Sequence, residues 1–380
     1  MISPEQTGAL TETGWFRVDD VAGDPVLAEV LRLRQACADE FTALMTSGRP
    51  AEAAVTTTGQ YGFTADGDES AARLRELRSH LVVNQTLPTG HPLAVLAPTF
   101  YGEDVPTAGA DRWSAMALRL HRLLDLFTME TMEALEERLG LAFGTIAGPL
   151  AMGERLLRFQ WYPALPDGPE ELFMVETDDG VIPVRGRLVA DGERRSPLIR
   201  VGPHKDMGHW TWQVYSTDSK LRFWDRRGQT VVPAPRGDWL YGNVCDFLEA
   251  EHPGLPTPIH WVDADRDGGD STRMSISYFA HVRPGAAGAD STWGAELYRR
   301  LATLGYATDP EVRQAIDLLH ERGDDRELTL ASIDWEATHA APPGFAVGTS
   351  RYYRRDEREP GGLGRRTRAE VGGLREELTG

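Results

Sequence analysis

The chain has 380 residues, of which 41% are hydrophobic and 26% are charged, a composition typical of folded globular proteins rather than of disordered ones. Its formal net charge of -18, from 40 Lys and Arg against 58 Asp and Glu, argues against nucleic-acid and anionic-membrane partners, which need clustered positive charge. Two cysteines cannot supply a disulfide framework or a cysteine-rich zinc site.

The N-terminal residues 1–14 are polar and lack the charged start and apolar core of a secretory signal. No apolar run in the sequence approaches the ~20 residues that a membrane-spanning helix needs. We therefore expect a cytoplasmic protein with no membrane partner. The sequence does not indicate an oligomeric state.

Two long amphipathic helices are predicted in the first 150 residues. The first begins at Asp24-Pro25, since Asp is a common N-cap and Pro a common first helical residue. Apolar residues at helical spacing continue from there to Met45. The second runs from Asp111 to Gly140 and would reach ~45 Å at ~1.5 Å per residue. We expect it either to break or to lie along a sheet.

Beyond residue 150, short segments rich in β-branched and aromatic residues alternate with Gly, Pro and Asp. Many short strands separated by turn signals are typical of an antiparallel sandwich or barrel. The predicted strands are Arg155–Tyr162, Pro197–Gly202, Trp210–Ser216, Leu221–Trp224, Thr230–Pro233, Trp239–Val244, Pro258–Val262 and Arg273–Val282.

The connection Pro163–Ser196 is long and carries Asp178-Asp179-Gly180 between apolar runs, which predicts an inserted hairpin. After the strands, helices are predicted near Trp293–Leu304 and Pro310–Arg322, followed by a Gly- and Arg-rich tail that we expect to be mobile. The sequence thus predicts an α+β fold in three regions. These are a helical region 1–150 packed on a barrel, a barrel core 151–290 with the insertion 163–196, and a C-terminal helical extension 291–380. We expect the insertion and the extension to cover the barrel mouth as a lid.

A candidate metal site is indicated by two segments of the barrel region. His204 and Asp206 are two residues apart in an extended segment, so strand alternation places both side chains on one face. His260 follows about 54 residues later, within a predicted strand. Two imidazoles and one carboxylate suit a non-haem iron with open coordination positions. Taken singly, each signal has another interpretation: a His-x-Asp pair is short enough to occur by chance, and His260 could be a histidine of the core. His209 and His252 are alternative ligands.

A second feature is the strand that begins at Arg273. Arg273, Ser275, Ser277 and Phe279 alternate with apolar residues, so they share one face. A guanidinium and a hydroxyl on the inner face of a barrel would be costly without an anionic partner. A bound carboxylate would satisfy both groups.

Together these segments resemble the isopenicillin N synthase-like branch of the non-haem iron, 2-oxoglutarate-dependent oxygenases. The branch pattern is His-x-Asp, a distal His about 54 residues later, and then Arg-x-Ser. The resemblance is strongest over residues 155–285 and ends near residue 290. Further matching segments are Gly14-Trp15-Phe16, Phe159–Pro163, Arg226–Pro233 and Gly237–Glu249.

The resemblance implies a double-stranded β-helix (jelly-roll) core flanked by N-terminal and C-terminal helices. It implies that His204, Asp206 and His260 hold Fe(II), with no catalytic residue beyond these ligands. It also implies that Arg273, Ser275, Tyr162 and Gln160 bind the cosubstrate 2-oxoglutarate. The expected activity is a dioxygenase that uses O2 to oxidise a C–H bond of a small molecule, in the tailoring of a bacterial natural product such as an amino acid or peptide.

Three departures from the family pattern affect the mouth of the site. Trp261 follows the distal His where the family usually has Arg, and the spacing to Arg273 is about three residues longer than usual. The Pro163–Ser196 connection is also longer than in plant members of the family. Two alternatives stay open: an isopenicillin N synthase-like oxidase that needs no 2-oxoglutarate and binds the substrate carboxylate with Arg-x-Ser, and a catalytically silent binding jelly roll.

Overall fold

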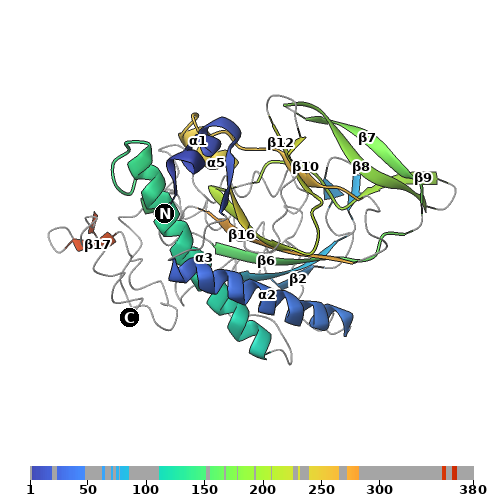
Figure 1. Ribbon diagram of the computed structural model, residues 1–380, viewed down its shortest axis with the longest axis horizontal. Helices are drawn as coiled ribbons and strands as arrows, with labels where there is room; N and C mark the ends of the chain where they lie inside the picture. Colours follow the sequence, from blue (N-terminus) through green and yellow to red (C-terminus); the bar gives the residue numbers. More distant parts are fainter. Residues whose placement is uncertain are drawn as a thin grey trace, which may run out of the picture.

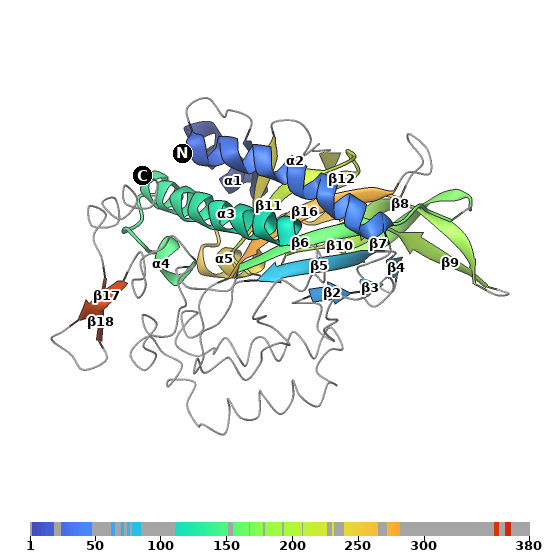
Figure 2. The ribbon, with the colours of Figure 1, turned by 90° about the horizontal axis from the view of Figure 1, so that it is seen from below.

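The computed structural model describes most of the region 2–281, together with two short C-terminal segments. The described residues are 2–18, 24–47, 62–64, 70–71, 74–76, 78–84, 111–150, 155–166, 168–177, 179–191, 194–206, 208–225, 230–231, 239–264, 272–281, 353–356 and 362–365. Figures 1 and 2 show helices and sheets gathered into layers.

The largest element is a seven-stranded antiparallel sheet. In spatial order its strands are β1 (Trp15–Val18), β14 (Leu240–Val244), β11 (Trp210–Ser216), β16 (Arg273–Ala280), β6 (Arg155–Tyr162), β5 (Ser79–Asn84) and β2 (Gly62–Thr64). The four central strands confirm segments that the sequence predicts. β1, β2 and β5 come from the region 1–150, so that region is not purely helical, because three of its segments complete this sheet.

Two long helices cover one face of this sheet. α2 (Pro25–Thr46) and α3 (Asp111–Arg138) pack side by side along it (Figure 2). The carboxylate of Asp24 caps α2 by accepting hydrogen bonds from the backbone amides of Val26 and Leu27, at 3.0 and 3.1 Å. α3 is a single helix that lies along the sheet, one of the two alternatives predicted for it. The apolar residues of alternate positions on the strands, such as Trp212, Phe159 and Ile276, form the core beneath these helices.

A four-stranded antiparallel sheet faces the opposite side of the large sheet. Its order is β10 (Val201–His204), β15 (His260–Val262), β12 (Leu221–Trp224) and β13 (Thr230–Val231). Buried side chains from both sheets meet in one cluster, formed by Tyr162, Val201, Leu221, Phe223 and Val262. The inner faces of the two sheets therefore enclose the space in which the predicted site residues lie.

The Pro163–Ser196 connection forms the predicted hairpin, β7 (Glu170–Thr177) and β8 (Gly180–Asp191). This hairpin continues into β9 (Arg194–Ile199), which pairs in parallel with β4 (Leu74–Glu76), and β3 (Ser70–Ala71) completes a five-stranded sheet. The hairpin packs behind β15, against Ile259 and Trp261, on the side opposite to His260. The described strands of the hairpin thus support the outer side of the four-stranded sheet. That the insertion covers the barrel mouth as a lid stays a prediction.

Three short helices complete the described fold: α1 (Pro4–Thr13), α4 (Ala147–Leu150) and α5 (Asp246–Glu251). α1 is missed by the sequence analysis, although Ser3 and Gln6 form a capping box at its start. It ends at Gly14, with φ 80°, where a Cβ atom would lie 1.8 Å from the carbonyl oxygen of Pro256. Glycine is required at this turn because no other residue fits that approach.

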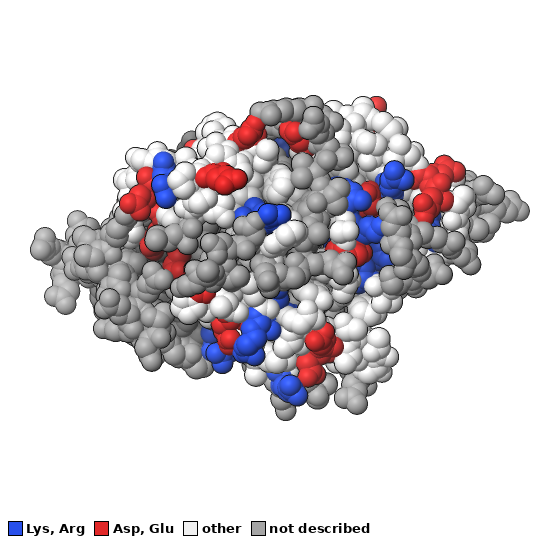
Figure 3. Space-filling model, viewed as in Figure 1, with Lys and Arg blue, Asp and Glu red and all other residues white. Residues whose placement is uncertain are grey.

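The predicted C-terminal helices at 293–304 and 310–322, and their lid role, lie outside the described residues. In the tail, β17 (Tyr353–Asp356) and β18 (Gly362–Arg365) pair as an antiparallel ribbon, so this part of the extension is not helical. Within the described residues, no helix is both long and apolar enough to cross a bilayer. On the face shown in Figure 3, described acidic and basic side chains are interspersed.

Candidate metal and carboxylate site

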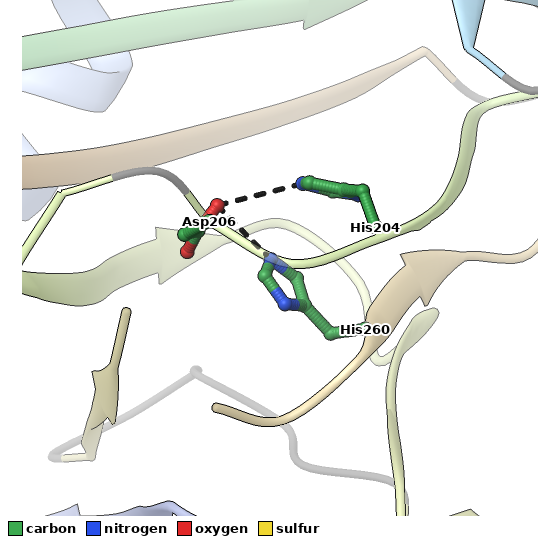
Figure 4. A group of neighbouring side chains, drawn as sticks. All are labelled: His204, Asp206 and His260. Carbon is green, nitrogen blue, oxygen red and sulfur yellow. Dashed lines mark ion pairs between the residues drawn. The ribbon is translucent and has the colours of Figure 1, made fainter. Parts of the chain in front are cut away.

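Three predicted ligands converge between the two sheets. His204 ends β10 and lies directly opposite His260 on β15, while Asp206 follows two residues later in the chain. The Nε2 atoms of both imidazoles are 3.5 Å from Oδ1 of Asp206 (Figure 4). One ligand atom from each of the three residues lies within 4.8 Å of the other two, as a shared metal ion requires. The structure thus brings together all three residues that the sequence analysis assigned to iron.

Hydrogen bonds fix how these ligands are presented. Nδ1 of His204 lies 2.8 Å from the carbonyl oxygen of Gly202. Because that oxygen can only accept, Nδ1 carries the proton and the Nε2 lone pair is left for a metal. Asn243 on β14 donates from Nδ2 to Oδ2 of Asp206 at 3.2 Å, so the large sheet holds the carboxylate in place.

The protonation states also suit a divalent metal. Burial alone would raise the pKa of Asp206, but the His260 and His204 rings and the amide of Asn243 hold it well below its usual range. Burial lowers the pKa of His260 to about 4. Near neutral pH the site therefore offers an ionised carboxylate and a neutral buried imidazole, the forms that bind metal.

The alternative histidines do not reach this cluster. Nε2 of His209 lies 3.1 Å from a carboxylate oxygen of Glu251, and His252 is the C-cap residue of α5. In the part of the chain that the structure describes, His204, Asp206 and His260 form the one group of three with metal-ligand geometry.

The Arg273–Ser275 pair lies on the inner face of β16, as the alternation predicts. Nη1 of Arg273 donates to Oγ of Ser275 at 3.1 Å. The Arg273 guanidinium lies 4.6 Å from the centre of the Tyr162 ring. Tyr162 on β6 is the residue that pairs directly with Arg273 in the sheet. Tyr162 donates its hydroxyl to Oε1 of Gln160 at 2.6 Å. All four residues assigned to the cosubstrate are thus neighbours.

Two charged residues near this group were not predicted. Asp218 accepts a hydrogen bond from Nε of Arg273 at 2.9 Å, and despite burial the Arg273 charge holds the pKa of Asp218 below its usual value. Arg200 stands 5.6 Å from the Tyr162 ring centre, and burial, together with the charge of Arg273, lowers its pKa to about 10. Neither residue belongs to a short motif, so only the folded chain reveals them. Two guanidiniums against one carboxylate leave a net positive charge, which favours an anion.

No protein-family model matches the sequence, and no curated protein matches it. Solved structures do match in fold. A candidate oxygenase from Shewanella oneidensis is 18% identical, with a TM-score of 0.56 over 79% of this chain and 94% of its own. A candidate 2OG-Fe(II) oxygenase family protein from Caulobacter crescentus is 20% identical, with a TM-score of 0.57 over 79% of this chain and 92% of its own. T7H of Neurospora crassa, solved in complex with alpha-KG, is 16% identical, with a TM-score of 0.56 over 78% of this chain and 89% of its own. By these likenesses the chain has the same mixed helix and antiparallel-sheet fold as these proteins.

Proposed function

We propose that the protein is an Fe(II)- and 2-oxoglutarate-dependent dioxygenase with the double-stranded β-helix core of the isopenicillin N synthase-like branch. The observation that carries the proposal is the convergence of His204, Asp206 and His260 opposite a buried Arg273–Ser275 pair. A site with three protein ligands leaves coordination positions open, which is the arrangement of a catalytic rather than a structural metal. The fold shared with candidate oxygenases supports the same proposal.

Each group of residues has a role in this proposal. His204, Asp206 and His260 would hold Fe(II), which when bound supplies the site for O2 and the redox chemistry. Arg273 and Ser275 would bind the distal carboxylate of 2-oxoglutarate, with Tyr162 and Gln160 beside it. These buried residues position the cosubstrate and exclude water. Asp218 holds the Arg273 guanidinium through Nε, and Arg200 keeps the site cationic.

The prime substrate in this proposal is a small molecule with an oxidisable C–H bond, and the pathway is the tailoring of a bacterial natural product. One alternative has a specific observation in its favour. The Arg273–Ser275 pair could equally bind the carboxylate of a substrate, as in an oxidase that needs no 2-oxoglutarate.

Separate measurements of O2 and 2-oxoglutarate consumption by the Fe(II)-loaded protein distinguish these functions. We expect both to be consumed together, slowly even without prime substrate, and both rates to vanish in Asp206→Ala. Oxygen consumption that is independent of 2-oxoglutarate would favour the oxidase. A protein that binds iron and consumes neither would be a silent binding protein.

A further inference from the structure

Arg158 lies on the inner face of the large sheet and has no role in the site described above. It is on β6, two residues before Gln160 and four before Tyr162, so all three side chains point to the same face. Its direct partner on β16 is Ser277, and its partner on β5 is Val82. The side chain is half-buried.

The Arg158 guanidinium has no counter-ion among the residues that the structure describes. Its Nε is buried without a hydrogen-bond partner, and no ion pair or hydrogen bond joins its side chain to any residue in the described part of the chain. Its one described contact is the ring of Phe279, 5.3 Å from the guanidinium carbon. Two other arginines of the same sheet are ion-paired: Arg155 with Asp125 at 2.6 Å and Arg273 with Asp218 at 2.9 Å. A buried guanidinium nitrogen without a partner is costly, so a ligand is the expected partner of Arg158.

The position of Arg158 in the sheet separates it from the cosubstrate anchor. Across the inner face, Arg158 lies in one row with Ser277, Gln213 and Tyr241. The next row toward one end includes Asn243, which holds Asp206. Toward the other end, the row of Tyr162 and Arg273 is four residues away, about 13 Å along the strand at ~3.3 Å per residue. The Arg158 row therefore lies between the candidate iron ligand and the cosubstrate anchor.

We propose that Arg158 binds an anionic group, a carboxylate, of the prime substrate. The proposal rests on the proposed function and extends it, because it assigns the substrate to the class of carboxylic acids. Arg273 and Arg158 then recognise two different carboxylates, one on the cosubstrate and one on the substrate. The Ser277 hydroxyl donates to Oε1 of Gln213 at 2.9 Å and accepts from Nε2 of Gln160 at 3.4 Å, so the wall beside Arg158 is polar and fixed.

Matched acid and amide probes test this assignment without knowledge of the natural substrate. Phenylacetate and 3-phenylpropionate are titrated, each beside its primary amide, into anaerobic protein loaded with Fe(II) and 2-oxoglutarate, and binding is measured by calorimetry. We expect the acids to bind wild type at least ~10-fold more tightly than the amides, because only the acids form a charge-assisted pair. In Arg158→Gln that preference should fall to within about twofold, and Arg158→Lys should restore part of it. The control is Arg185→Gln, which removes an exposed charge on β8 and should leave the preference unchanged.

The 2-oxoglutarate titration separates failure of this proposal from failure of the proposed function. Wild type and Arg158→Gln should bind 2-oxoglutarate equally. Absence of 2-oxoglutarate binding in wild type would count against the proposed function. The Arg158 assignment is wrong if no acid binds better than its amide, if Arg158→Gln keeps the preference, or if Arg158→Gln loses 2-oxoglutarate binding while remaining folded.

Discussion

At the scale of single residues, Asn243 links the large sheet to the candidate metal site. It is fully buried, its Nδ2 donates to Asp206, and its Oδ1 has no hydrogen-bond partner among the described residues. A buried amide in this position orients the carboxylate and favours its ionised form. Its role is positioning, because it contacts a ligand rather than the reacting groups.

Replacement of Asn243 by Ala should therefore weaken metal binding without unfolding the protein. We expect the affinity for Fe(II), or for Co(II) as a spectroscopic substitute, to fall roughly 10- to 100-fold. Cys245→Ala is the matched control, because Cys245 is buried on the same segment and contacts Thr211 rather than a ligand. Equal metal affinities for wild type and Asn243→Ala would show that Asp206 does not depend on this contact.

A second prediction for single residues concerns the contribution of Arg200 to 2-oxoglutarate binding. Since Asp218 offsets one of the two guanidiniums beside Tyr162, removal of Arg200 would leave the proposed cosubstrate site without net positive charge. We expect Arg200→Gln to bind 2-oxoglutarate about 10-fold more weakly, which corresponds to ~1.4 kcal/mol. The loss should shrink as salt screens the charge. Unchanged affinity at low salt would remove Arg200 from the site.

At the scale of elements, the packing of β14 against β11 depends on Gly242. A Cβ atom at Gly242 would lie 2.5 Å from ring atoms of both Trp210 and Trp212, two fully buried side chains of the core. Gly242→Ala should destabilise the protein by about 1–3 kcal/mol, the usual cost of overpacking. Gly8→Ala in α1 meets no atom within 4 Å and should not destabilise it. Urea unfolding of the two variants would contradict this account if both behaved alike.

Helix α3 is joined to β6 by the ion pair between Asp125 and Arg155, with Nε and Oδ1 2.6 Å apart. Burial alone would raise the pKa of Asp125, but Arg155 outweighs it and lowers that pKa below the ordinary value of 3.8. A carboxyl with a lowered folded-state pKa stabilises the protein above its unfolded-state pKa, and that stability is lost as the pH falls through the folded-state pKa.

Asp125→Asn should accordingly cost about 1–3 kcal/mol of unfolding free energy near pH 7, since it removes the Asp125 carboxylate from the buried Arg155 guanidinium while solvent reaches the partly exposed position 125. The difference between variant and wild type should narrow when the same urea titration is made at acidic pH, because wild-type Asp125 protonates as the pH falls through its lowered folded-state pKa. A difference that is constant between the two pH values would mean that the ion pair does not contribute as described.

Elements also differ in how well the sequence predicts them. β6, β11 and β12 have the predicted bounds, because alternation and flanking turn residues mark strands that are buried on one or both faces. β5 was not predicted, since its short segment 79–84 takes its place in the sheet by pairing with β6 and β2, which are distant in sequence or very short. The candidate ligands His204, Asp206 and His260 could be proposed from their spacing and the family resemblance. Asp218, Arg200 and Arg158 belong to no such pattern, so they are recognised only from the side chains around them in the folded chain.

At the scale of the whole molecule, the positive charges between the two sheets contrast with the negative net charge of the chain. The chain carries a formal charge of -18, yet the enclosed space between its sheets is lined by Arg158, Arg200 and Arg273. The helices α2 and α3 bury the apolar face of the large sheet, so its other face is free to carry these polar groups (Figure 2). The fold thus gathers positive charge in the interior of an acidic protein, which suits the dianionic 2-oxoglutarate of the proposed function.

The most direct test of this account is a titration of 2-oxoglutarate into anaerobic Fe(II)-loaded protein, followed through the visible absorption of the chelate. Wild type should develop the band, and Asp206→Ala should not. Arg273→Ala should require ~10- to 150-fold more 2-oxoglutarate, as expected for the loss of charge-assisted hydrogen bonds worth roughly 1.5–3 kcal/mol. Coincident curves for wild type and Arg273→Ala, or a wild-type protein that binds iron and never develops the band, would contradict the account.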